Sequence, residues 1–129
     1  TVMFVKLHNY HWYVTGEQFF TLHAKFEELY NEAASHLDAL AERLLALGGK
    51  PVATLSDALA VASVKEARGG ESAREMVQAV VDDFSNMVKE LKTGMELAAS
   101  SRDDTTGDLF LSILSSLEKH IWQLRAYLG

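Results

Sequence analysis

Apolar residues recur along most of the chain at steps of three and four residues, which is the period of one buried face of a helix. The clearest run spans about residues 17–47, with apolar positions at Phe20, Phe26, Leu29, Ala33, Leu37, Leu40, Leu44 and Leu47. Two further runs cover about residues 72–99 and 109–128, separated by an expected loop at 101–107. An apolar, aromatic segment at residues 1–14 precedes them. The pattern predicts four long helices.

Glycine and proline mark the expected ends of these helices. Gly48, Gly49 and Pro51 follow the second segment, and a glycine pair at residues 69–70 precedes the third. A glycine followed by a proline is a typical stop signal for a helix. Between these breaks we expect a short helix at residues 56–62, with Ser56 as its N-cap. The chain is therefore predicted to be all-α: a four-helix bundle with a short extra helix in the crossover between the second and third helices.

Composition narrows the class of protein. The 129 residues suffice for one domain and are too few for two ordinary ones. No apolar stretch is long enough for a transmembrane helix, and cysteine is absent, which excludes disulfides and thiolate metal sites. Without a leader for export, a cytoplasmic location is expected. Because Thr1 opens inside an apolar run without an initiator methionine, we expect that a native N-terminal segment is missing.

The charge is −6, from 18 acidic and 12 scattered basic residues. Binding to a nucleic-acid backbone relies on clustered Lys and Arg, because counterion release supplies most of that affinity. An acidic surface instead raises the local concentration of cations. The balance favours a protein that attracts metal ions and disfavours direct DNA binding by this chain.

The second predicted helix carries two pairs of metal-ligand side chains. His23 and Glu27 lie four residues apart, as do Asp38 and Glu42. This step places two side chains one turn apart on one face, and all four fall within a sector of about 100°. Imidazole and carboxylate together suit non-haem iron. However, the pairs are separated by about 16 Å along the helix, so one chain cannot join them at one metal centre.

The two pairs share one midpoint, between Glu32 and Ala33. If the helix packs antiparallel against its own copy about that point, each pair meets the other pair of the second copy. The facing residues are then His23 with Glu42 and Glu27 with Asp38. One pair of chains would gain two equivalent sites with ligands from both chains.

Two alternatives compete with this interpretation. Acidic residues four apart usually form a solvated face, and Glu42 can pair with Arg43 or Lys25 instead of a metal. A di-iron site inside one bundle is disfavoured, since such sites use a glutamate three residues before a histidine, and none of the five histidines has one.

Several motifs resemble the Dps family, the DNA-binding proteins from starved cells or mini-ferritins. They are KLHNYHWY at residues 6–13, Gly16, FFTLH at 19–23, EELY at 27–30, DALAER at 38–43, GGKP at 48–51 and KHIW at 119–122. The resemblance implies a ferritin-like fold and a twelve-subunit cage with iron sites between two-fold-related subunits. It also implies a ferroxidase that prefers hydrogen peroxide to oxygen and stores ferric mineral, with one or two irons per site.

The resemblance assigns roles to individual residues. His11, His23 and Glu27 would be ligands from one subunit, and Asp38 and Glu42 from its two-fold mate. Glu27 stands where relatives often carry Asp, which leaves its role more open. Trp12, next to His11, would intercept stray oxidising equivalents or simply pack at the interface.

Three acidic residues surround the start of the last predicted helix: Asp103, Asp104 and Asp108. In relatives acidic side chains line a three-fold pore here, and we expect Asp104 and Asp108 to line an iron-entry pore. Capping of the helix N-terminus is the alternative role.

Two other functions remain open at this stage. Some relatives pack the nucleoid through a Lys-rich tail, and the first alternative is therefore a chain that protects DNA by direct binding, with little or no ferroxidase activity. The second alternative is a plain helical oligomer whose histidines and acids are polar interface residues.

Overall fold

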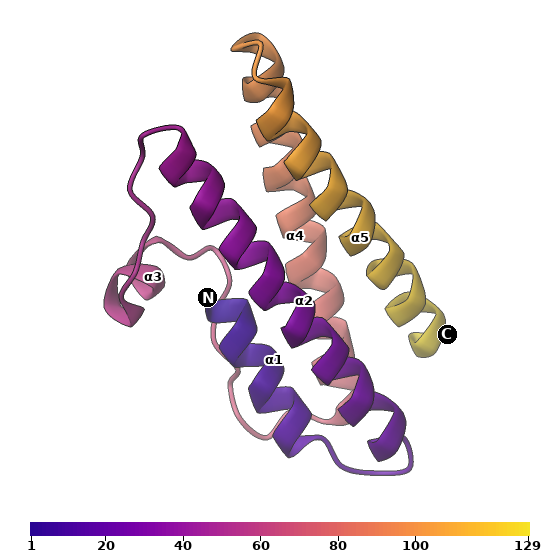
Figure 1. Ribbon diagram of the computed structural model, residues 1–129. Coiled ribbons are helices and arrows are strands. Elements are labelled where there is room, and N and C mark those ends of the chain that lie inside the picture. The colour runs from indigo at the N-terminus through magenta and orange to yellow at the C-terminus, as the bar shows by residue number, and fades with distance from the viewer. The chain divides into compact units, whose positions relative to one another are not determined.

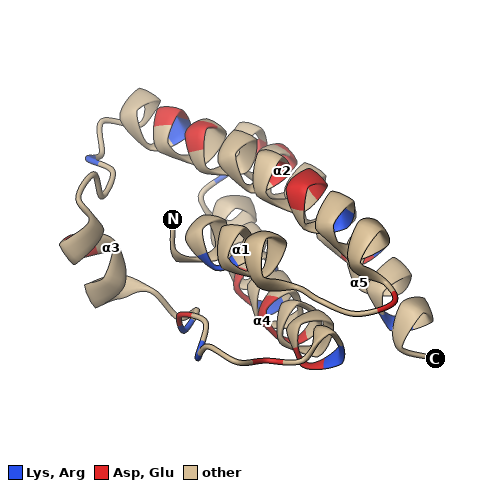
Figure 2. Cartoon of the chain, turned by 90° about the horizontal axis from the view of Figure 1, so that it is seen from below, with Lys and Arg blue, Asp and Glu red and all other residues tan.

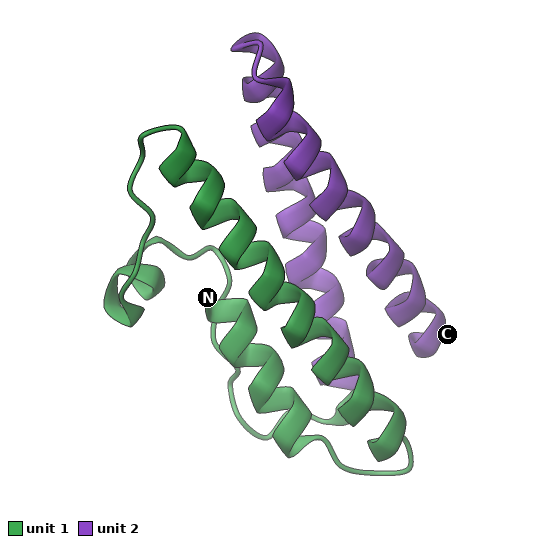
Figure 3. Ribbon diagram, viewed as in Figure 1, with its two compact units in different colours: residues 1–73 green, residues 74–129 purple.

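The computed structural model describes all of residues 1–129 and is entirely helical apart from its connections (Figure 1). The elements are α1 (Val2–Tyr13), α2 (Phe19–Ala46), α3 (Leu55–Val61), α4 (Ala73–Ser100) and α5 (Asp104–Leu128). The prediction of four long helices and a short one between the second and third is confirmed. None of the helices combines the length and apolar character needed to cross a membrane. The chain divides into two compact units, Thr1–Ala73 and Arg74–Gly129 (Figure 3).

In the first unit, α1 and α2 form a hairpin in which the two helices lie side by side (Figure 1). The turn between them includes Gly16, whose φ of +106° favours glycine. Tyr10 of α1 and Phe26 of α2 are fully buried, with ring centroids 5.7 Å apart. This contact fixes how the two helices face each other.

The expected apolar stripe of α2 is buried only in part. Phe26 and Leu29 are buried, but Leu44 is 40% exposed, Leu47 54% and Phe20 84%. A period of three to four residues identifies an apolar face without saying what covers it. Here α1, with 12 residues against the 28 of α2, covers only part of the length of its neighbour, and Phe20 lies on the opposite face by helical phase.

The short helix α3 begins one residue earlier than expected, and the prediction that Ser56 caps it is wrong. Its N-cap is Thr54, whose Oγ1 accepts a hydrogen bond from the backbone N–H of Asp57 at 3.2 Å. Thr54 has the extended backbone of an N-cap, with φ −126° and ψ 152°, whereas Ser56 already lies inside the helix.

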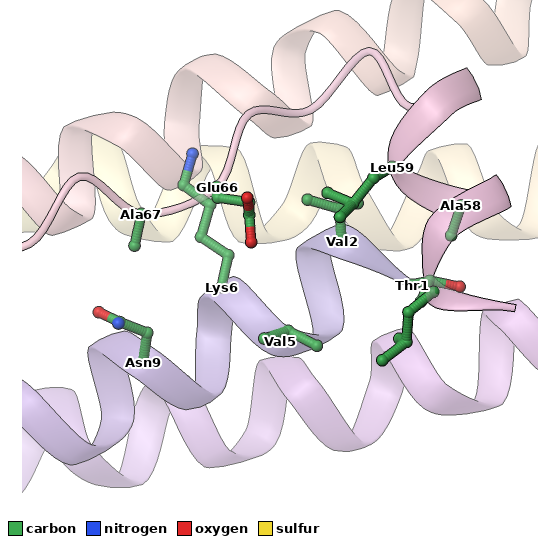
Figure 4. A pocket seen from close by; sticks show the side chains of 10 residues that line it. Thr1, Val2, Val5, Lys6, Asn9, Ala58, Leu59, Glu66 and Ala67 are labelled. Carbon is green, nitrogen blue, oxygen red and sulfur yellow. The ribbon is translucent and has the colours of Figure 1, made fainter.

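A pocket lies beside α3, between α1 and the segment that follows α3 (Figure 4). Lys6 and Glu66 lie at one end of it, and Val2 and Leu59 lie toward the other. None of the predicted metal ligands lines this pocket.

In the second unit, α4 and α5 run antiparallel as a second hairpin (Figure 1). The expected 101–107 loop is shorter than predicted, because Asp103 caps α5. One carboxylate oxygen of Asp103 accepts the backbone N–H of Thr106 at 3.1 Å, and the other accepts its hydroxyl at 2.5 Å. Gly94 of α4 lies where a Cβ would come within 2.8 Å of the Phe110 ring of α5, so the helices approach closely at this point.

Candidate metal centre

Two of the predicted ligands, His11 of α1 and His23 of α2, meet inside the first hairpin. Their rings are stacked with centroids 3.7 Å apart and planes inclined by 16°. His11 is buried and His23 is half-buried. The turn at Gly16 reverses the chain, which brings together two residues that are 12 positions apart in sequence.

Each histidine is held by the main chain of the other. The Nδ1 of His11 lies 2.7 Å from the carbonyl oxygen of His23, and the Nδ1 of His23 lies 2.7 Å from the carbonyl oxygen of His11. A carbonyl oxygen can only accept, so both Nδ1 atoms must carry the proton and donate. In a neutral imidazole with this tautomer the lone pair is on Nε2. The pair therefore offers two Nε2 atoms as ligands, with ring orientations fixed in advance.

Aromatic rings surround the two imidazoles. Phe19 stacks on His23 with centroids 4.9 Å apart, and Tyr30 meets His11 edge-on at 5.3 Å. The ring of His8 stacks on the ring of Tyr30, with centroids 3.7 Å apart. The sequence interpretation assigned no role at the site to Phe19, Tyr30 or His8. For Tyr30 the spacing could have indicated its place near the site, since it follows His23 by seven residues, or two helical turns, on the same face of the helix.

Trp12 is adjacent to His11 in sequence but projects elsewhere. Its side chain is 65% exposed, and its ring lies 5.2 Å from the ring of His8. A series of ring contacts joins Trp12 to His8, His8 to Tyr30 and Tyr30 to His11.

The three predicted carboxylate ligands, Glu27, Asp38 and Glu42, are all exposed. Figure 2 shows several acidic positions along α2. By helical phase, the face of these three ligands lies roughly 160° around α2 from its buried side chains. The chain by itself assembles no group of three or more His, Asp or Glu side chains able to hold a metal. One chain therefore brings together the two histidines and leaves the carboxylates on an open helix face.

Two ion pairs on α2 bear on the alternative that its charged side chains pair with one another instead of binding a metal. Lys25 Nζ lies 3.0 Å from a carboxylate oxygen of Glu28, three residues along the helix. His36 Nε2 lies 3.4 Å from a carboxylate oxygen of Glu32, near the midpoint of the ligand pairs. In the second unit, Asp103 is the N-cap of α5, whereas Asp104 and Asp108 are exposed on the first turns of that helix.

Comparison with known proteins finds a matching family model, similar sequences and similar solved structures. The sequence model of the ferritin-like domain, Ferritin, matches residues 2–129. General stress protein 20U of Bacillus subtilis is 64% identical over 129 residues, covering 100% of this chain and 89% of that protein. DNA protection during starvation protein 2 of Bacillus anthracis is 58% identical, covering 100% and 88%. The crystal structure of Dps from Staphylococcus aureus superposes with a TM-score of 0.98 at 49% identity, covering 99% of this chain and 86% of that one.

The chain belongs to the ferritin-like Dps family. Its fold is the ferritin-like four-helix bundle with a short extra helix in the crossover, as the sequence predicts. Membership of this family associates the chain in general terms with iron storage and with the protection of DNA.

Proposed function

We propose that this Dps-family chain is a ferroxidase subunit that oxidises Fe(II), preferably with hydrogen peroxide, at sites shared between two-fold-related subunits. The ferric product would be stored as mineral inside a dodecameric cage. The observation that carries the proposal is the reciprocal hydrogen bonding of His11 and His23, which leaves two Nε2 lone pairs for a metal. The bonds to the main chain fix the orientation of both rings, and this donor set suits ferrous iron.

The carboxylates would come from both chains. His11, His23 and Glu27 would bind from one subunit, and Asp38 and Glu42 from its mate. The mirrored spacing about the midpoint of Glu32 and Ala33 supports this arrangement, as does the exposure of the carboxylate face in one chain. A second copy placed antiparallel on that face would supply the ligands that one chain lacks.

This ligand set accounts for the proposed chemistry. Neutral imidazoles and ionised carboxylates bind Fe(II) and leave coordination positions open to an oxidant. Two irons bridged by Glu42 would each give one electron to hydrogen peroxide, which takes up two protons and forms two waters. Paired delivery of electrons avoids the hydroxyl radical that a single Fe(II) releases. The protein's part is to hold two metal ions close together.

Three further roles belong to the same proposal. Trp12 would donate an electron to stray oxidants, through or beside His8. Asp104 and Asp108 would line an acidic path for iron into the cage. Protection of DNA, which the names of relatives describe, would follow from the removal of iron and peroxide. The net charge of −6 and the scattered basic residues favour this indirect route over direct contact with DNA.

The test is anaerobic ferrous titration followed by addition of peroxide, on the parent and on His23→Ala with Glu42→Ala. The parent should bind iron saturably at up to two per site and oxidise it rapidly. The double variant should lose rapid oxidation while remaining assembled, as size-exclusion chromatography would verify. Rapid oxidation that survives in the double variant would refute the assignment of the site.

A further inference from the structure

The most exposed large apolar side chain in the structure is Phe20, at 84%. It lies on α2 one turn before His23. At the other end of the same helix Leu45 is 57% exposed, one turn after Glu42. Both side chains fall at the centre of the carboxylate-bearing face, within about 20° of each other by helical phase. Exposed apolar side chains at these two places are not explained by packing within the chain.

The two positions are mirrored about the same point as the metal ligands. Residues 20 and 45 have their midpoint between Glu32 and Ala33, as do 23 with 42 and 27 with 38. An antiparallel second copy in the register that pairs His23 with Glu42 therefore also sets Phe20 opposite Leu45. This agreement is independent of the ligands, because the two side chains were identified by their exposure and apolar character and not by metal chemistry.

We propose that Phe20 of one subunit packs against Leu45 of a second copy and closes the outer end of each shared metal site. The inference rests on the proposed function for the existence of the site. The pair lies one turn farther from the midpoint than His23 and Glu42, about 5 Å along the helix. Phe19 already covers the His23 ring within its own chain, at 4.9 Å. The Phe20–Leu45 contact adds an apolar wall supplied by both chains.

This contact has two physical consequences. Apolar side chains at the end of the site keep water from competing with the oxidant for open positions on the metal. The contact also fixes the register, because sliding α2 by one residue rotates each apolar side chain about 100° away from its mate. Phe20 and Leu45 are thus positioning residues that act through the pairing of the two helices.

Thiol cross-linking tests the contact directly, since the chain has no native cysteine. A variant with Phe20→Cys and Leu45→Cys is treated with a short bismaleimide, which joins two thiols by addition across its two double bonds. Within one chain the two positions are about 37 Å apart along α2, beyond the reach of the reagent. Denaturing gels should show most chains as covalent dimers.

The matched control is Phe20→Cys with Leu47→Cys. Leu47 is 54% exposed, close to the value for Leu45, but it points to the other side of α2. This control and each single-cysteine variant should remain largely monomeric on the gel. Equal cross-linking in test and control variants, or none in the test variant, would overturn the proposed contact.

The outcomes separate this inference from the proposed function. If the parent binds and oxidises iron but the paired cysteines do not cross-link, the contact is wrong and the ferroxidase stands. If the paired cysteines cross-link selectively while the parent shows no saturable iron binding, the contact stands and the ferroxidase falls.

Discussion

His11 and His23 satisfy their Nδ1 atoms within one chain before any metal or second subunit arrives. Both acceptors are main-chain carbonyls, so the arrangement depends on the backbone of the hairpin and not on other side chains. Fixing two ligands in advance reduces the entropy lost when a metal binds. At the residue scale, the hairpin of α1 and α2 is what prepares the site.

Amide substitutions at His11 should separate the structural role of Nδ1 from the ligand role of Nε2. His11→Asn places an N–H near the position of Nδ1, so it should keep the hydrogen bond to the His23 carbonyl and nearly normal thermal stability. It offers no imidazole nitrogen, so ferrous affinity should fall at least about tenfold. Isothermal titration under anaerobic conditions and thermal unfolding measure the two effects.

The control for this experiment is His11→Ala, which removes both functions. It should lose affinity to a similar degree and also lose roughly 1 kcal/mol of stability, because the part-buried His23 carbonyl is left without its donor. Unchanged iron affinity in His11→Asn would exclude His11 as a ligand.

Some of these residue-level features could be predicted from sequence and others could not. The four-residue steps of His23 with Glu27 and Asp38 with Glu42 follow from helical geometry alone. The contact of His11 with His23 crosses a turn, so spacing did not indicate it, and only the family resemblance did. Thr54 and Ser56 are both good capping residues, and the two-residue difference between them lies within the uncertainty of a helix start.

At the scale of elements, the two halves of α2 differ in how far their apolar side chains are buried. Its first half buries Leu22, Phe26 and Leu29 in the hairpin, and its second half leaves leucines exposed. Glycine and proline punctuation located the ends of α2 well, since the breaks act locally. Burial along the helix depends on what packs against it, and therefore could not be predicted from period alone.

The α4–α5 hairpin makes a paired prediction about glycine. Alanine normally stabilises a helix relative to glycine. At Gly94, however, the new Cβ would meet the Phe110 ring at 2.8 Å, so Gly94→Ala should destabilise by about 1–3 kcal/mol. At Gly107 the nearest atom would be 3.8 Å away, so Gly107→Ala should stabilise by about 0.5–1 kcal/mol.

Denaturant unfolding followed by circular dichroism measures both changes. The two substitutions add the same methyl group to helices of the same hairpin, so their opposite signs isolate the close approach at Gly94. Stabilisation by both would show that the Phe110 ring moves aside without cost.

At the scale of the whole molecule, one chain carries only part of the proposed metal site. It collects two imidazoles but no cluster of three ligands, and its remaining carboxylates lie on an exposed face. The sequence predicted this division through the shared midpoint of two ligand pairs. The account therefore depends on assembly: activity should belong to pairs of chains.

Complementation between two inactive variants tests that claim most directly. Chains carrying His23→Ala and chains carrying Glu42→Ala are co-expressed, and the mixed cages are assayed for ferrous binding and peroxide-driven oxidation. In a mixed pair one site regains both side chains and the other loses both, so random pairing restores about one site in four. As a control, chains carrying His23→Ala are co-expressed with chains carrying Glu27→Ala. This mixture should restore no sites, since both ligands come from the same chain. Recovery of about a quarter of the parent's sites in the first mixture alone is the predicted result, and activity no higher than that of either variant would contradict the shared site.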